Sequence, residues 1–257
     1  MANNDTIQKT LTVALLLCIV CSVVVSTASV VLKPMQVANK EQDFKRNILS
    51  AAGLLEDGVA VDEQFSQIKT MIVDLETGKF TDAVAADTFD QRKSVKDPAL
   101  SDALSSADDI AGLSRREKYA KVYLVNGDSG LETVILPISG YGLWGTLYGF
   151  LAIKNDMNTV VGMGYYDHKE TPGLGAEVDN PRWKGLWGGK KLYNSDGSVA
   201  IQVIKGSVAP GSPGAESKID GLSGSTLTSV GVDNMMKFWL GENGYAPFLN
   251  NLKAGEA

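Results

Sequence analysis

The segment Asp220-Gly221-Leu222-Ser223-Gly224-Ser225-Thr226-Leu227-Thr228 leads into a helical pattern near the end of this 257-residue chain. Apolar side chains follow it at the spacing of one helix face: Val232, Met235, Met236, Trp239 and Leu240. Gly241 predicts the end of that helix. Thr226 is therefore expected just upstream of a helix N-terminus, where unpaired N–H groups and the helix dipole favour a bound phosphate. A capped loop without a ligand is the alternative interpretation.

A second unusual segment is Glu170-Thr171-Pro172-Gly173-Leu174-Gly175. Two glycines that flank a leucine allow the backbone to approach a flat ring closely, and the leucine can cover the ring face. This pattern indicates a pocket for a planar cofactor. A Pro-Gly turn with only a structural role is the alternative.

Composition excludes several classes of function. The net charge is −6, and there is no basic stripe of the kind that binds nucleic acid. The lone histidine, His168, has no recognisable partners for a hydrolase triad, and no further histidine or cysteine outside the N-terminal segment suggests a metal site. We therefore predict no catalytic residue and no bound metal in the soluble part of the chain.

Residues 10–32 carry no charge, and as a helix they would extend about 35 Å, enough to cross a bilayer. We predict a transmembrane helix; a cleaved signal peptide is the alternative, but the stretch is long and only Lys9 precedes it as a basic residue.

Cys18 and Cys21 fall inside this segment and are expected to be packing or lipid-facing thiols. The alternative is an iron–sulfur site that they share with a partner's cysteines. Four basic residues follow the helix, and by the positive-inside rule they would place the large domain in the cytoplasm.

The remaining pattern predicts an α+β domain with an antiparallel sheet and packed helices. Two β-hairpins are expected, one from 122–125 and 133–138 and one from 149–154 and 160–166, and a further strand is expected at 200–205. A short helix is expected at 47–55, a helix or helix-strand pair at 65–75, and a peripheral layer at 78–116. The predicted organisation is a cytoplasmic N-terminus (1–9), a transmembrane helix (10–32), a juxtamembrane and peripheral helical layer (33–120) and the α+β domain (121–257).

The segment from Asp220 to Thr226 resembles the flavinylation motif Asp-x-x-Ser/Thr-Gly-Ala-Thr of bacterial FMN-binding domains. In that motif the last threonine is joined to the FMN phosphate by a phosphoester, which implies Thr226 as the acceptor here. Ser225 stands where the family usually has alanine, and its hydroxyl offers a second possible ester position.

The segment Thr-Pro-Gly-Leu-Gly (171–175) lies about fifty residues before this motif, and both follow one predicted transmembrane helix. This combination is similar to that of the FMN-binding subunits of two related bacterial redox pumps. Segments 89–93, 140–144 and 239–242 are similar to the C-type subunits of Na+-translocating NADH:quinone oxidoreductases. The alternatives are the G-type FMN subunit of a ferredoxin:NAD+ oxidoreductase, an ion-translocating electron transport complex, and an anchored, non-enzymatic binding or assembly module.

The resemblance implies an electron-carrying subunit of a complex in the bacterial inner membrane that oxidises NADH, reduces ubiquinone and pumps Na+ out of the cell. It also implies that a separate flavin transferase attaches the FMN, that other subunits bind NADH, quinone and Na+, and that the large domain is periplasmic. Within the site, Gly173 and Leu174 are expected to pack on the ring, and Thr171 and Glu170 to make polar contacts or shape the loop. The candidates for the phosphate are Ser223, Gly224 and Ser225, beside Thr226. Trp144 either shields the ring or belongs to the core, and Lys205 either pairs with the phosphate or is solvated.

Overall fold

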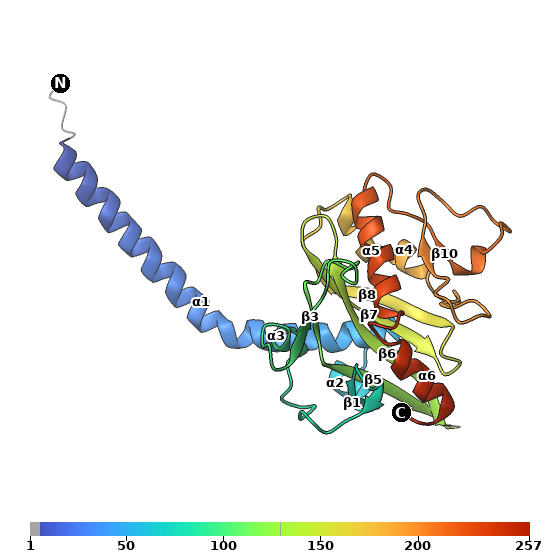
Figure 1. The fold of residues 1–257 in the computed structure, drawn as a ribbon. Coiled ribbons are helices and arrows are strands. Elements are labelled where there is room, and N and C mark those ends of the chain that lie inside the picture. The colour runs from blue at the N-terminus through green and yellow to red at the C-terminus, as the bar shows by residue number, and fades with distance from the viewer. Residues whose placement is uncertain (1–5, 129) are drawn as a thin grey trace. The chain divides into compact units, whose positions relative to one another are not determined.

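The computed structural model describes residues 6–128 and 130–257, which form two compact units divided between Asp43 and Phe44. The first unit is the part of helix α1 (Ile7–Ala51) before Phe44, coloured blue in Figure 1. Its apolar stretch is long enough to cross a membrane, and Cys18 and Cys21 are exposed on it.

The helix expected at 47–55 is the last part of α1, which ends at Ala51, and is not a separate element. Pro34 lies inside α1 without ending it. Residues 35–46 are mostly good helix formers such as Met, Gln, Ala, Lys and Glu, so the helix propagates from the apolar segment into the second unit.

The second unit, Phe44–Ala257, is built on a six-stranded antiparallel sheet in the order β2-β1-β5-β6-β7-β8. The strands are β1 (Ile68–Asp74), β2 (Lys79–Phe80), β5 (Tyr119–Gly127), β6 (Gly130–Tyr141), β7 (Thr146–Lys154) and β8 (Val160–Asp167). Both predicted hairpins, β5–β6 and β7–β8, are confirmed, and so is the α+β class. The sheet also includes β1 and β2, so it begins before residue 121; the segment expected as a helix or helix-strand pair forms α2 (Val61–Phe65) and β1.

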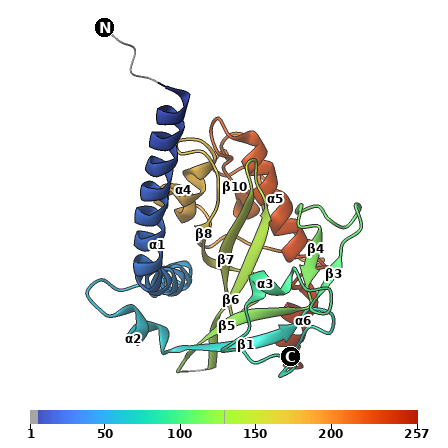
Figure 2. The same ribbon diagram turned by 90° about the vertical axis from the view of Figure 1, so that its left-hand side faces the viewer.

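Each face of the sheet has its own core, because alternate side chains of a strand point to opposite faces. Helices α5 (Thr226–Trp239) and α6 (Ala246–Ala254) cover one face and lie on the same side of β6 and β7 (Figure 2). The five predicted apolar residues from Val232 to Leu240 are all buried there. The end of α1 covers the other face, where Ile48 and Leu49 pack with Tyr123 and Phe150.

Short elements surround this framework. They are α3 (Gln91–Ser94), the antiparallel pair β3 (Ser101–Ala103) and β4 (Arg115–Glu117), η1 (Gly175–Asp179), α4 (Pro181–Gly185), η2 (Ala215–Ser217), and the parallel pair β9 (Gln202–Val203) and β10 (Lys218–Ile219). The strand expected at 200–205 is therefore reduced to two residues. Arg92 of α3 binds the sheet, with its guanidinium 3.7 Å from the centre of the Tyr148 ring and 2.7 Å from the Asp167 carboxylate.

Glu117 is a buried carboxyl group outside the candidate site. Its side chain accepts a 2.6 Å hydrogen bond from Gln91 Nε2, and burial raises its pKa. Because the folded-state pKa lies above the unfolded value, the protonated carboxyl favours the fold at low pH, and that contribution is lost as pH rises through the folded-state pKa.

A Glu117→Gln substitution is therefore expected to raise the melting temperature of the domain at about pH 8 and to have less effect at about pH 4, since the neutral amide removes the cost of the buried charge. Thermal unfolding followed by circular dichroism at both pH values measures this. Glu216→Gln, at an exposed position, is the matched control. An equal change in melting temperature at both pH values would contradict the raised pKa of Glu117.

Candidate functional site

Glu170 joins three segments that are distant in the sequence. One carboxylate oxygen, Oε1, accepts hydrogen bonds from the backbone N–H groups of Leu143 (3.0 Å) and Trp144 (2.9 Å), between β6 and β7. The other, Oε2, accepts a 2.6 Å hydrogen bond from the Thr228 hydroxyl of α5. Glu170 is 5% exposed and Thr228 is fully buried. The carboxylate therefore fixes the 170–175 loop to the first turn of α5 and to the β6–β7 turn.

Two glycines make room for this carboxylate. A Cβ atom on Gly175 would lie 2.4 Å from Glu170 Oε2 and 2.7 Å from Thr228 Oγ1. A Cβ atom on Gly142 would lie 2.6 Å from Glu170 Oε1. These distances are shorter than van der Waals contact, so the sequence needs glycine at both positions because of close packing.

Gly175→Ala is expected to destabilise the domain by about 1–3 kcal/mol, because the added methyl group displaces the Glu170–Thr228 hydrogen bond. Thermal unfolding followed by circular dichroism measures the effect. Gly185→Ala is the control, since a Cβ atom there would point into open space. Equal stability of the two variants would contradict the packing argument.

The hydroxyl groups between residues 223 and 229 differ in accessibility. Ser225 and Thr228 are buried, and their hydroxyls lie 2.8 Å apart in a hydrogen bond. Ser229 is also buried; its hydroxyl donates to the Ser225 carbonyl at 3.0 Å and accepts from Leu222 N at 2.8 Å. Ser223 and Thr226, in contrast, are exposed. The buried hydroxyl of Ser225 is therefore poorly placed to react from outside the folded chain.

Thr226 is the first residue of α5 and does not precede the helix as expected. The first backbone hydrogen bond of the helix joins Ser229 N to Ser225 O at 3.1 Å. The N–H groups of residues 226–228 therefore have no partner within the helix, as is general for a first turn. Ser225 occupies the N-cap position, but its side chain caps none of the described N–H groups and bonds to Thr228 instead.

The structure brings the two glycine-rich motifs together. A Cβ atom on Gly224 would lie 3.1 Å from Leu174 Cδ2, and Gly224 has a φ of 73°. The 170–175 loop is closed by a 3.1 Å hydrogen bond from Leu174 N to Thr171 O, and Gly173 has a φ of 75°. Leu174 is 45% exposed, so it forms an open apolar surface beside the first turn of α5.

Trp144 does not belong to the core. Its side chain is 62% exposed, so the interpretation as a core tryptophan is wrong. The residue lies in the β6–β7 turn, whose backbone Glu170 holds through the Leu143 and Trp144 N–H groups. The alternating pattern of the strands ends at this turn, so burial of the indole could not be inferred from it.

Other residues of the site support the loops. Asp220, the first residue of the motif, accepts a 2.8 Å hydrogen bond from Val208 N, and its carbonyl accepts one of 2.8 Å from Trp183 Nε1. His168 Nδ1 accepts from Glu170 N at 3.2 Å, while His168 Nε2 is 2.8 Å from an Asp179 carboxylate oxygen. Asp220 and His168 therefore fix the shape of the site. Lys205 is exposed.

The sequence did not identify Thr228 as a residue of the site, and it did not predict that His168 has a structural role there. The spacing of Ser225 and Thr228 is a usable signal, because residues three apart share one side of a helix. The partner of Thr228 lies 58 residues away at Glu170, and no local pattern links the two.

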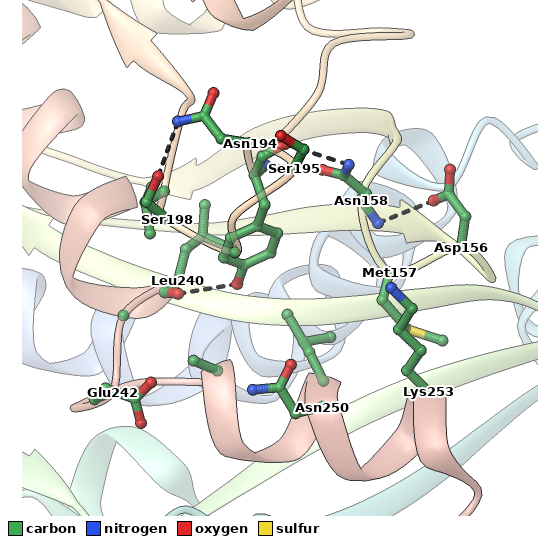
Figure 3. Close-up of a pocket in the computed structure, with 16 residues that line it drawn as sticks. Asp156, Met157, Asn158, Asn194, Ser195, Ser198, Leu240, Glu242, Asn250 and Lys253 are labelled. Carbon is green, nitrogen blue, oxygen red and sulfur yellow. Dashed lines mark hydrogen bonds between the residues drawn. The ribbon is translucent and has the colours of Figure 1, made fainter.

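A cavity of about 370 Å³ lies elsewhere, where the segment after α5 meets the β7–β8 turn and α6 (Figure 3). Its lining includes Asn158, Glu242, Asn250 and Lys253, and none of the candidate residues. Its wall is held by the Tyr193 hydroxyl, which donates to Leu240 O at 2.9 Å. The cavity is therefore separate from the site around Thr226.

Comparison with known proteins assigns the family. A family model described as an FMN-binding domain matches residues 142–241, which include every candidate residue. The C subunit of the Na+-translocating NADH-quinone reductase from Pseudomonas aeruginosa is 55% identical over 261 residues, with 100% of both chains covered. The chain belongs to this family of C-type subunits.

Further members of the family agree with this assignment. The Pasteurella multocida protein is 49% identical over 258 residues, covering 98% of this chain and 97% of its own. The crystal structure of Shewanella oneidensis NqrC has a TM-score of 0.78 and 36% identity, and the match covers 84% of this chain and 99% of that one. The expected resemblance to the C-type subunits is confirmed, and these relatives favour it over the G-type flavin subunit.

Proposed function

We propose that the chain carries electrons, through an FMN joined by a phosphoester to Thr226, in the membrane complex to which its family belongs. That complex is a Na+-translocating NADH-quinone reductase, and the proposed quinone is ubiquinone. One observation carries the choice of residue: the hydroxyls of Ser225, Thr228 and Ser229 are buried and hydrogen bonded, and of the exposed Ser223 and Thr226 only Thr226 lies in α5, at its first position.

The residues around Thr226 fit both ends of FMN. The unpaired N–H groups and positive dipole of the first turn of α5 suit a phosphate, with Ser223 and Gly224 directly before them. The exposed side chains of Leu174 and Trp144 offer apolar surface for a flat ring. Thr171 and Glu170 shape the loop that presents Leu174.

When bound, FMN supplies one- and two-electron redox chemistry, and attachment through the phosphate leaves its ring unmodified. Thr226 would act as the tether, since its oxygen forms the bond to phosphorus with the net loss of one water. The side-chain groups identified in this site hold loops and have no evident part in activating Thr226, so we propose that a separate flavin transferase makes the ester. NADH, quinone and Na+ would be bound by other subunits.

We further propose that the large domain lies on the periplasmic side of the inner membrane, with residues 1–9 in the cytoplasm. The basic residues after the apolar stretch, Lys33, Lys40, Lys45 and Arg46, oppose this orientation. Large domains nevertheless translocate against a modest charge bias. Protease added to spheroplasts should digest the domain before the inner membrane is ruptured; protection until rupture would contradict the orientation.

Intact-mass measurement of the full-length chain, produced with and without a flavin transferase, tests the proposed cofactor linkage. The expected result is an added mass equal to FMN minus water only when the transferase is present. An unmodified chain in both preparations, with quinone reduction intact in the assembled complex, would favour the alternative of a non-enzymatic binding or assembly module.

A further inference from the structure

The second unit exposes a group of large apolar side chains around the start of α5. In the described part of this unit, the large apolar side chains that are exposed lie in two places: at residues 54–59, just after α1, and in this group. Trp144 and Leu174 belong to the candidate flavin pocket. The others define what we term the outer apolar face: Ile110, Tyr141, Leu143, Leu227 and Val230, each 38–61% exposed.

Packing brings the segments that carry the outer apolar face together. Tyr141 N donates a 2.7 Å hydrogen bond to Ala111 O, which places Ile110 beside the end of β6. A Cβ atom on Gly231 would lie 2.3 Å from Tyr141 O, so α5 contacts β6 directly at this point. Leu227 and Val230 are three residues apart on α5 and share one side of the helix.

The composition of this face is unusual for a surface in water. Residues 139–153 and 221–232, which supply most of it, contain no charged side chain. The buried side of α5 is already occupied by Val232, Met235 and other core residues, so the outward side would normally be polar. Contiguous exposed apolar surface of this kind marks a binding site.

We propose that the outer apolar face docks an apolar surface of the neighbouring subunit that exchanges electrons with the flavin on Thr226. The proposal rests on the proposed function. The chain belongs to a family of proteins that work within a complex, and we assign it one redox group, so its donor and acceptor must lie in other subunits. Electron transfer requires close approach, and Leu227 and Val230 lie within about one turn of Thr226.

The chemistry of the face favours a protein over lipid as the occupant. Depletion of charge and enrichment in aromatic residues are typical of the centre of protein interfaces. Surfaces that insert into anionic membranes usually surround their apolar side chains with basic residues. The two uncharged segments that supply most of the face offer no such residues, and the whole chain has a net charge of −6.

Cysteine labelling tests the proposal, because residues 33–257 contain no natural cysteine, and mass spectrometry of the peptides separates the label on the introduced cysteine from any on Cys18 and Cys21. Val230→Cys and Ile110→Cys are made in the full-length flavinylated chain and reacted with a membrane-impermeant maleimide, alone in detergent and in the assembled complex. Both should react about tenfold or more slowly in the complex. Lys253→Cys, at an exposed position on α6, should react equally in both. Equal protection of all three positions would overturn the proposal.

Two further measurements separate the possible failures. If Val230→Cys is protected in vesicles of phosphatidylethanolamine and phosphatidylglycerol without other subunits, the face meets lipid and the proposal is wrong. In the complex, Val230→Asp should retain its covalent FMN but lower NADH-dependent quinone reduction about tenfold, with Lys253→Glu unchanged. Normal turnover with FMN intact overturns the docking face alone, whereas a wild-type chain without FMN overturns the proposed function.

Discussion

A Thr226→Ala chain is expected to carry no covalent flavin, and the complex that contains it should show only background quinone reduction. The substitution removes the oxygen that would form the proposed ester. Ser225, Thr228 and Ser229 cannot take its place, because their hydroxyls are buried and hydrogen bonded. Because Thr226 is exposed, the free energy of unfolding should change by only about 0.5 kcal/mol. Ultraviolet-excited fluorescence of the denatured chain on a gel measures the flavin.

Matched variants of the same segment define the control for this experiment. Thr226→Ser keeps an oxygen at the same position and should retain flavin. Ser225→Ala loses a hydrogen bond to Thr228 but leaves Thr226 unchanged, so it should also remain fluorescent. Fluorescence in Thr226→Ala together with its loss in Ser223→Ala would assign the ester to Ser223 instead.

Replacement of Glu170 by leucine should produce the largest loss of stability among the site variants. The change leaves the N–H groups of Leu143 and Trp144 and the Thr228 hydroxyl without their acceptor. Unsatisfied buried polar groups cost about 1–3 kcal/mol each, and we expect a total of about 3 kcal/mol. For a domain of this size that corresponds to a melting temperature about 6–12 °C lower. Flavin content should fall as well, because the 170–175 loop loses its connection to α5.

Glu170→Gln separates the loss of hydrogen bonds from the loss of charge. The glutamine oxygen can accept from the two N–H groups, while its nitrogen donates to Thr228 Oγ1 and the Thr228 hydroxyl donates to Ser225 Oγ. We expect this variant to lose less than about 1.5 kcal/mol and to keep most of its flavin. Thermal unfolding and in-gel fluorescence should be measured on both variants. A glutamine variant as damaged as the leucine variant would contradict the hydrogen-bond network.

Elements with strong local patterns could be predicted from the sequence. The buried side of α5 follows from the spacing of Val232, Met235 and Trp239, and the two hairpins follow from alternating β-rich runs around polar turns. The membrane-length helix follows from 23 consecutive uncharged residues. In each case the signal lies within about one element, where periodicity reports directly on which side is buried.

Features that depend on distant contacts could not be predicted. The Glu170–Thr228 hydrogen bond joins residues 58 positions apart, and the place of β1 in the sheet depends on its pairing with β5. The exposure of Trp144 depends on the turn that Glu170 holds. The end of α1 is fixed by packing of Ile48 and Leu49 against the sheet. The sequence around Pro34, which lies inside α1, has no pattern that predicts this packing.

Attachment of FMN to Thr226 is tested most directly by tandem mass spectrometry of one tryptic peptide. Cleavage after Lys218 and Lys237 releases residues 219–237, which include every hydroxyl from Ser223 to Ser229. We predict that a mass equal to FMN minus water stays on fragments that contain Thr226 and is absent from N-terminal fragments ending at Ser225. The added mass on Ser223 or Ser225, or a peptide without it from a host that makes the flavin transferase, would contradict the assignment.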